Sequence, residues 1–269
     1  YQTPLTRAFA LLTRPALALA TLVLIVSSGG AAFAAEGTLP GDLLYPVKVS
    51  VVEPLRTSLA RSPEAKARVY ASLAERRLNE ATLLADQDRL STTTDAMLAD
   101  SFTRHARASL ATGSRDTREE DSARLSAYEN VLAKMDTMKG RGGANLVRRA
   151  VLAHLMDTSR TIAERDDERT TLRLKKAANT SLTVSATNLD SLAETLATST
   201  SVRAYDALKK AEDFAAEGDE LLKKRDTKGA SKAFKNSLRA AARLDVFTNA
   251  AATLNIDPFD TPTATVETE

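Results

Sequence analysis

Apolar residues recur at helical spacing along most of the chain, and the clearest case follows Ser62-Pro63-Glu64. This tripeptide is typical of a helix start, because Ser can cap free backbone N–H groups and Pro fits the first turn. The inner stripe of the helix, expected to reach about Asp88, consists of Ala67, Ala71, Ala74, Leu78, Ala81 and Ala85. Its alternating spacing of four and three residues is helical, and its small side chains let a second helix approach closely. The charged residues expected on other faces include Arg68, Glu75, Arg76 and Glu80.

Two more helices are predicted before a glycine-rich loop. The stretch Ser91-Thr92-Thr93-Thr94-Asp95 is expected to cap a helix that continues to about Thr112 and stops at Gly113-Ser114. The next helix is expected over residues 117–138, with an apolar side made of Leu125, Tyr128, Leu132 and Met135. Residues 139–143, KGRGG, are the strongest helix breaker and predict a loop.

The pattern after this loop predicts one long helix, followed by a stripe of leucines that we call a seam. The helix is expected to start near Ala144, with an apolar face marked by Leu152, Leu155 and Ile162. Residues 164–169 are charged and contain no Gly or Pro, which predicts that they continue the same helix in solvent. The following seam consists of Leu182, Leu189, Leu192 and Leu196. The stretch Ser199-Thr200-Ser201 is then expected to cap another helix.

Residues 202–253 predict a helical hairpin that turns around residues 225–229. The stripe of its first helix consists of Ala204, Leu208, Ala211, Ala215, Gly218 and Leu222. The stripe of its second helix consists of Ala230, Ala233, Ser237, Ala241 and Leu244. The hairpin is similar to a tetratricopeptide-type helix pair, but it occurs once and shows no period of about 34 residues, which argues against a repeat array. The tail from Asp257 is rich in Thr, Pro and acidic residues, and we expect it to be disordered.

Together these patterns predict an all-α protein. Aromatic residues make up only 4% of the chain and Trp is absent, which favours thin helix-on-helix packing. We expect an antiparallel bundle of about six to eight helices, preceded by a transmembrane or signal helix. The expected divisions are an N-terminal helical domain at 36–138, the loop at 139–143, a C-terminal helical region at 144–256 and the tail at 257–269.

Residues 15–35 form an uncharged segment that suits a bilayer. As a helix, these 21 residues span about 31 Å, close to the thickness of the hydrocarbon core. Arg7 and Arg14 precede the segment and acidic residues follow it, so the positive-inside rule places residues 1–14 in the cytoplasm. The sequence therefore predicts a single-pass protein of the cytoplasmic membrane whose C-terminal bulk is extracytoplasmic.

Two alternatives remain for this segment. Only residues 15–26 are strongly apolar, and Ala32-Phe33-Ala34 fits the small-x-small pattern of a cleavage site. Cleavage near Ala34 would release the rest of the chain as a secreted or periplasmic protein. A buried core helix is the third interpretation.

The sequence LPGDLLYPVK, residues 39–48, joins this segment to the helical part. Pro40-Gly41 indicates a turn, Asp42 is expected to cap the next helix, and Pro46 fits that helix's first turn. That helix is expected over residues 47–60, with an interruption or kink near Pro54. An apolar cluster for docking on neighbouring helices is made of Leu43, Leu44, Tyr45 and Val47. The residues expected to form a rigid structural connector are Leu39, Pro40, Gly41, Asp42, Leu44, Tyr45, Pro46 and Lys48.

This motif resembles the bacterial family of domain of unknown function 5667. Its members have an apolar segment, then A-E-x-x-L-P-G-D-x-L-Y-P-V-K, then a helix with K-A and E-R-R-L-x-E-A elements. Here those elements are Lys66-Ala67 and residues 75–81, so the likeness is specific over about residues 34–84. The resemblance implies a membrane-anchored, extracytoplasmic helical module. Some relatives carry a cytoplasmic anti-sigma region before the membrane segment, and residues 1–14 have no Cys or His for a zinc site.

Few residues suggest chemistry. The chain has no Cys and a net charge of +2, which exclude a thiol nucleophile and give no electrostatic reason to expect nucleic acid as a partner. His105 and His154 fall on separate predicted helices and lack zinc-site spacing, so we expect structural roles. An acidic cluster, expected to favour a helix start, consists of Asp116, Glu119, Glu120 and Asp121. A basic cluster near the glycine-rich loop would suit an anionic envelope partner, although a solvated loop is the preferred interpretation. It consists of Lys134, Lys139, Arg141, Arg148 and Arg149.

The sequence favours a non-enzymatic interaction or scaffold module of the bacterial envelope. Its membrane contact would be residues 15–35 and its partner another envelope protein, and its sharpest version is the sensing part of an anti-sigma-like regulator. No catalytic residue, metal ligand, cofactor or small-molecule substrate is predicted. The alternative is an envelope enzyme of unrecognised type, which would need a convergent polar site.

Overall fold

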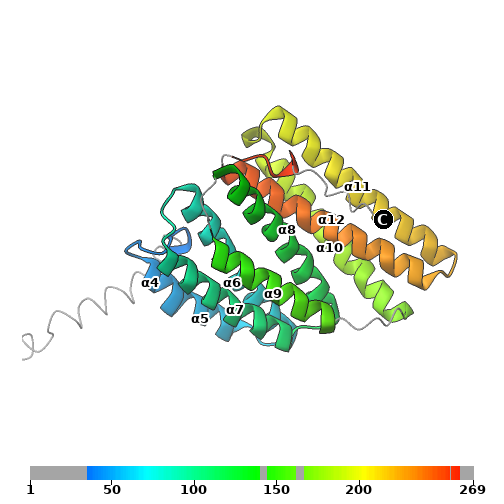
Figure 1. Ribbon diagram of the computed structural model, residues 1–269. Coiled ribbons are helices and arrows are strands. Elements are labelled where there is room, and N and C mark those ends of the chain that lie inside the picture. The colour runs from blue at the N-terminus through cyan, green and yellow to red at the C-terminus, as the bar shows by residue number, and fades with distance from the viewer. Residues whose placement is uncertain (1–34, 140–143, 162–166, 255, 261–269) are drawn as a thin grey trace, which may run out of the picture. The chain divides into compact units, whose positions relative to one another are not determined.

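A computed structural model describes residues 35–139, 144–161, 167–254 and 256–260 (Figure 1). The secondary structure throughout those ranges is helical, with no strand, which confirms the all-α prediction. The expected membrane segment at residues 15–35 lies almost entirely outside them. Among the helices that are described, none combines the length and the apolar character that crossing a bilayer requires. The chain divides into two compact units, residues 1–59 and 60–269.

The described part of the first unit is a short helical run with one widened turn. It consists of α4 (Tyr45–Val47), the π-helical turn η1 (Lys48–Val52) and α5 (Glu53–Leu59). The Glu53 N–H bonds to the Lys48 carbonyl, five residues earlier. A proline ring clashes with the carbonyl four residues before it, and the wider turn directly before Pro54 relieves that conflict. The irregularity expected near Pro54 is therefore confirmed.

The second unit contains seven long helices in its described part. They are α6 (Pro63–Asp86), α7 (Thr92–Thr112), α8 (Arg115–Lys139), α9 (Asn145–Thr161), α10 (Glu168–Leu192), α11 (Thr198–Lys223) and α12 (Thr227–Thr253). Two short 3₁₀ turns, η2 (Ala193–Thr195) and η3 (Pro258–Asp260), follow α10 and α12. Side-chain caps explain several starts: Ser62, Ser91 and Asp226 accept the N–H of Ala65, Thr94 and Gly229 at 3.0, 3.1 and 2.9 Å.

The helices pack as two groups that meet along α8 and α12. In the first group, α6–α9, α8 lies beside α6 and antiparallel to α9, and α7 packs on both α6 and α9 (Figure 1). In the second group, α10–α12, α12 packs on both α10 and α11. Helices next to each other in sequence run antiparallel, whereas α8 and α12 run parallel. α9, which the sequence analysis placed in the C-terminal region, packs against α7 and α8.

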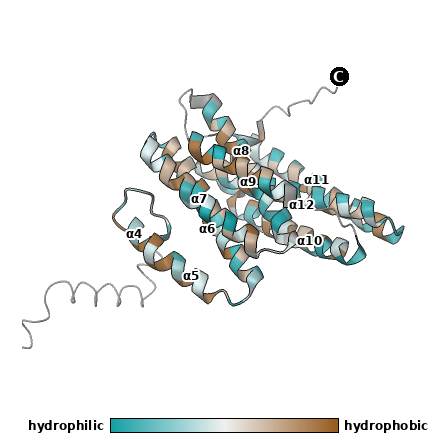
Figure 2. Ribbon diagram, turned by 60° about the horizontal axis from the view of Figure 1, so that its bottom comes forward, coloured by the Kyte–Doolittle hydropathy of each residue, from teal (hydrophilic) through white to brown (hydrophobic). Residues whose placement is uncertain are grey.

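The hairpin of α11 and α12 confirms the prediction for residues 202–253. The predicted α12 stripe is buried along its whole length, and Ala204, Ala211, Ala215 and Gly218 are buried on α11. A Cβ atom on Gly218 would lie 2.6 Å from Phe234 Cε1, so any side chain here would force the ring to shift. Around this contact the core cluster consists of Leu174, Ala178, Ala230, Phe234 and Leu238. Figure 2 shows the corresponding alternation of apolar and polar residues around the helices.

The prediction of one long helix through residues 164–169 is wrong. α9 ends at Thr161 and α10 begins at Glu168, while residues 162–166 lie outside the described residues. Asp167 has an extended backbone, with ψ of 161°, and its Oδ1 accepts the Thr170 N–H at 2.7 Å. An extended capping residue starts a new helix instead of continuing an old one. The charged run therefore contains a helix start.

The predicted apolar face of α9 is also wrong. Leu152 is exposed and Leu155 half-buried, and the expected Ile162 lies outside the described residues. The buried side consists of Val147, Val151 and Thr158. Both carboxylate oxygens of Asp95, on α7, accept backbone N–H groups of α9, from Leu146 at 2.9 Å and from Val147 at 3.1 Å. This cap from a neighbouring helix fixes where α9 starts and which side faces inward.

Two expectations near α11 need correction. The cap was expected within residues 199–201, but α11 already begins at Thr198 and its capping position, Ala197, makes no side-chain cap bond. Thr200 is buried and donates to Asp257 Oδ2 at 3.2 Å. Disorder was expected from Asp257, yet Asp257 pairs with Arg203 at 3.1 Å and Phe259 stacks edge-on against Phe247 at 5.5 Å. Residues 261–269 lie outside the described residues.

In the seam predicted before α11, Leu189 and Leu196 are buried, whereas Leu182 and Leu192 are half-buried.

Candidate functional site

The LPGDLLYPVK motif is built around a reverse turn. Leu39 to Asp42 form it, with the Asp42 N–H bonded to the Leu39 carbonyl at 2.9 Å, Pro40 in second place and Gly41 in third. Gly41 has φ of +98°, the value that a type II turn requires at this position and that disfavours any side chain. Asp42 Oδ2 accepts the Leu39 N–H at 2.8 Å, so the turn is closed from both ends.

The cap expected from Asp42 is not the one that the structure shows. The capping position of α4 is Leu44, which makes no side-chain cap bond, and the carboxylate of Asp42 faces back to Leu39. The Tyr45 N–H instead bonds to the backbone carbonyl of Asp42 at 3.1 Å. Pro46 stands in the first turn of α4, as expected. A turn residue that can bond in either direction along the chain is ambiguous in sequence alone.

Lys48 ties the motif together. Its Nζ donates to the Thr38 carbonyl at 2.9 Å and lies 5.7 Å from the centre of the Tyr45 ring. The side chain is only 4% exposed, although lysine normally keeps its ammonium group in water. Leu43, in contrast, is 92% exposed. The carboxylate of Asp42 and the ammonium group of Lys48 thus hold the motif's own backbone.

The strongest electrostatic feature of the second unit is a guanidinium shared by two carboxylates. Arg124, on α8, bonds Glu75 of α6 through Nε at 2.6 Å and Nη2 at 2.9 Å. Its Nη1 bonds Asp245 of α12 at 2.7 Å. Asn188 of α10 donates to the other Asp245 oxygen, also at 2.7 Å. Burial by itself lowers the pKa of Arg124, but Glu75 and Asp245 outweigh it and hold the pKa above its usual range. Four helices are joined at one level by these contacts.

A second buried carboxyl lies beside this network. Asp121 Oδ2 accepts the Ser109 hydroxyl of α7 at 2.6 Å. Burial raises the pKa of Asp121 to about 7, with the charges of Glu75 and Glu120 adding to the effect and the Ser109 bond and Arg124 opposing it. The acidic cluster expected to serve only a helix start therefore includes a carboxyl that changes charge near neutral pH.

The other members of the acidic and basic clusters are spread over separate partners. Glu119 is buried and lies 3.6 Å from Lys235 and 3.8 Å from Arg239. Arg148 pairs with Glu129 at 2.9 Å and Asp136 at 3.3 Å.

The remaining residues of those clusters do not form an anion site in the described part of the chain. Lys134 donates to the Asp257 carbonyl and Arg149 is exposed. The side chains of Asp116 and Lys139, and all of Arg141, lie outside what the structure describes.

Both histidines lie against aromatic rings. His105 stacks on Tyr70 with ring centres 6.4 Å apart, and His154 meets Phe102 edge-on at 6.1 Å. Burial, followed by the charges of Arg77 and Arg104, lowers the pKa of His105 to about 4. Across the residues that the structure describes, no group of three His, Cys, Asp or Glu side chains is arranged to hold a metal ion.

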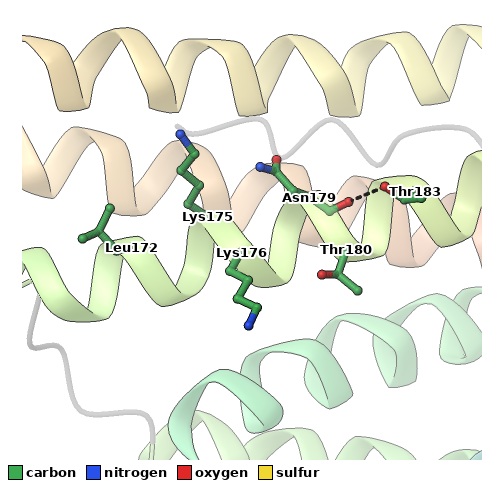
Figure 3. Close-up of a pocket in the computed structure, with 6 residues that line it drawn as sticks. All are labelled: Leu172, Lys175, Lys176, Asn179, Thr180 and Thr183. Atoms are coloured by element: carbon green, nitrogen blue, oxygen red, sulfur yellow. Dashed lines mark hydrogen bonds between the residues drawn. The ribbon is translucent and has the colours of Figure 1, made fainter.

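Two hollows follow the outer side of α10. The first, of about 440 Å³, is lined by Leu172, Lys175, Lys176, Asn179, Thr180 and Thr183 (Figure 3). All six residues come from α10 itself. Figure 3 shows Lys175 and Lys176 pointing to opposite sides, and Lys175 pairs with Asp219 of α11 at 2.7 Å. This surface has no convergent set of polar groups.

The second hollow, the α10–α12 cavity, has about 480 Å³ and two walls. Its lining consists of Thr183, Val184, Thr187, Asn188 and Ser191 of α10 and Asp245 and Asn249 of α12. It contains Asp245 of the Arg124 network. Neither this cavity nor the network was predicted from the sequence, although Arg124 lies next to Leu125 and four residues before Tyr128, inside the predicted apolar side of α8. Asp245 likewise interrupts an apolar run, between Leu244 and Val246.

Residues 37–137 match the model of the family described as Domain of unknown function (DUF5667). The match confirms the resemblance and extends it from the motif through α7 and nearly all of α8. Glu75, Asp121 and Arg124 lie inside the matched range, whereas Asn188 and Asp245 lie outside it. No curated protein and no solved structure matches the chain.

Proposed function

We propose that this chain, which carries a DUF5667 domain over residues 37–137, is a non-catalytic helical interaction module anchored in the bacterial cytoplasmic membrane. Its bulk lies outside the cytoplasm and its partner is another envelope protein. The anchor is the uncharged segment at residues 15–35, oriented by Arg7 and Arg14. In its sharpest form, the module is the sensing part of an anti-sigma-like regulator.

The observation that carries the proposal is how the motif behind the apolar segment uses its polar groups. The Asp42 carboxylate and the Lys48 ammonium group both bond to backbone atoms of residues 38–39. Such bonds stiffen a connector. An interaction module needs a defined link between its anchor and its helical surfaces, and this motif supplies one. Leu43, which is 92% exposed, is the position of the motif from which a partner can be probed.

One observation favours the alternative, an envelope enzyme. Asp121 has a pKa raised to about 7, the range in which a carboxyl can act as general acid or base. However, Asp121 lines neither of the two hollows along α10. Its Oδ2 accepts a hydrogen bond from the Ser109 hydroxyl of α7. We therefore assign Asp121 to the packing of α6, α7 and α8.

The test is the topology of the mature protein in its native membrane. Intact mass would show whether residues 1–34 are kept, and protease added to whole cells would show which part is outside. The proposal expects a full-length chain whose bulk is digested from outside. A chain that begins near Ala35 would instead be a released protein, and protection of the bulk would place it inside the cell; either result overturns the proposal.

The interaction itself can be tested by photo-crosslinking in cells. A crosslinking amino acid at Leu43 is expected to capture a distinct envelope protein, while the same group at Ser50, an exposed polar position of the first unit, captures much less. Equal, diffuse labelling from both positions would contradict a specific contact at the connector.

A further inference from the structure

The side chains that line the α10–α12 cavity present mainly hydrogen-bond acceptors. Three hydroxyl groups line it, and each already gives its proton to a helix carbonyl. Thr183 donates to Asn179 O at 3.0 Å, Thr187 to Thr183 O at 2.9 Å and Ser191 to Asn188 O at 2.8 Å. A hydroxyl whose proton is bound in this way can offer only lone pairs to a ligand.

The two amide side chains show the same bias. Asn249 Nδ2 donates to the Asp245 carbonyl at 2.7 Å and approaches Asp245 Oδ1 at 3.4 Å, and Asn188 Nδ2 donates to Asp245 Oδ1 at 2.7 Å. With the nitrogens turned to Asp245, the amide oxygens of Asn188 and Asn249 remain as acceptors. The lining therefore presents up to five neutral oxygen acceptors and one spare amide N–H, from Asn188.

The charge beneath the lining has the matching sign. Glu75 and Asp245 share the single guanidinium of Arg124, which leaves a net charge of −1 when both carboxylates are ionised. None of the seven lining residues is basic. The apolar part of the wall is Val184, which is 55% exposed. The hollow is open to solvent and has a volume of about 480 Å³.

We propose that the α10–α12 cavity binds a primary ammonium group carried on a short alkyl chain. An ammonium group has three N–H donors and a positive charge, so it complements both the acceptor oxygens and the net negative charge. The alkyl chain would lie against Val184. A free diamine and the side chain of a diamino acid share this chemistry. This inference does not depend on the function proposed above.

The first experiment is calorimetric titration of the full chain in detergent micelles with cadaverine. Two matched compounds separate the contributions: pentanediol keeps the chain length without charge, and the bis-trimethylammonium analogue keeps the charge without N–H donors. We expect saturable binding of cadaverine alone. Equal binding of either matched compound would overturn the proposal, as would no saturable binding of cadaverine at millimolar concentration.

The second experiment places that binding in the cavity. Thr187→Val removes one acceptor and keeps the shape, and is expected to weaken cadaverine binding about fivefold. Thr187→Asp adds a carboxylate and is expected to tighten it by a similar factor. Thr180→Val, on the same helix but lining only the first hollow, is the control and should leave binding unchanged. If all three variants bind as the parent protein does, the cavity is not the site.

Discussion

The helix groups α6–α9 and α10–α12 are packed by different kinds of contact. In α6–α9, charged and titratable side chains reach from helix to helix: Glu75 to Arg124, Asp95 to the start of α9, and Asp121 to Ser109. In α10–α12, small hydroxyls make the fully buried cross-helix bonds, while contacts of charged side chains, such as Asn188 with Asp245 and Lys175 with Asp219, lie in partly exposed positions. Ser185 donates to the Ala241 carbonyl at 2.9 Å and Ser237 to the Ala211 carbonyl at 2.8 Å. The stability of the first group should therefore depend on pH and on its charged side chains. The stability of the second group should depend more on whether added side-chain volume fits between its helices.

The largest effect is expected where the two groups meet. Arg124→Met leaves the side chains of Glu75 and Asp245, which are 17% and 9% exposed, without their shared partner. Breaking a fully buried ion pair on one side costs about 3–5 kcal/mol, and the loss of one partner from two carboxylates should approach the lower end of that range. Urea unfolding should show this loss in the free energy of unfolding. Arg203→Met, which removes the more exposed partner of Asp257, is the control and should cost below about 1 kcal/mol. A similar small loss in both variants would mean that the Arg124 network contributes little.

The next largest effect is a pH dependence of stability that should arise in the α6–α9 group. The pKa of Asp121 is raised to about 7 in the folded protein, so its protonated form is the favoured one there. The stabilisation that the protonated carboxyl gives to the folded state is fully present below the ordinary pKa of 3.8. This stabilisation is lost as pH rises through about 7. Asp121→Asn should therefore remove a decline of about 3–4 kcal/mol in unfolding free energy between about pH 4 and pH 7. Denaturant unfolding at several pH values measures it.

A control for this experiment is Asp100→Asn, an exposed carboxylate that pairs with Arg104 on the same helix. It should leave the pH dependence as it is in the parent protein. An unchanged slope in Asp121→Asn would contradict the assignment of the decline to this carboxyl.

The smallest effect belongs to the second group. Gly218→Ala places a Cβ atom against the Phe234 ring, which costs about 1–3 kcal/mol, while the better helix propensity of Ala returns about 1. We expect a net loss of about 1 kcal/mol by thermal or urea unfolding, equal at acidic and neutral pH. In the background of Phe234→Leu the same change should be neutral or stabilising. A loss that persists without the ring would show that another contact is responsible.

Local signals explain which parts of this fold were predictable. The starts of α6 and α12 are marked by short local motifs, Ser62-Pro63-Glu64 and Asp226-Thr227. Stripes of small residues identify the inner faces of both helices. The start of α10 was hidden, because Asp167 caps a helix from inside a run of charges. The inner face of α9 depends on Asp95, fifty residues earlier in the chain, and no local pattern carries that information.

The candidate sites were predictable to different degrees. The reverse turn of the connector could be predicted from the sequence, because Pro40 followed directly by Gly41 is typical of such a turn. The Arg124 network needs α6, α8, α10 and α12 at one level, which only the tertiary structure supplies. The sequence does contain a signal for the network, because Arg124 and Asp245 are charged residues at positions that otherwise belong to an apolar helix side. The prediction placed charged residues on outer faces and therefore did not use this signal.

The contacts of Asp95 and Arg148 have a consequence for chain connectivity. α9 is held at its start by Asp95 of α7, and Arg148 joins it to Glu129 and Asp136 of α8. The peptide link between α8 and α9 is then not what keeps α9 in position. Two fragments, one ending at Lys139 and the other beginning at Ala144, should reassemble when produced together, so this junction is the natural place to split the protein into a complementing pair.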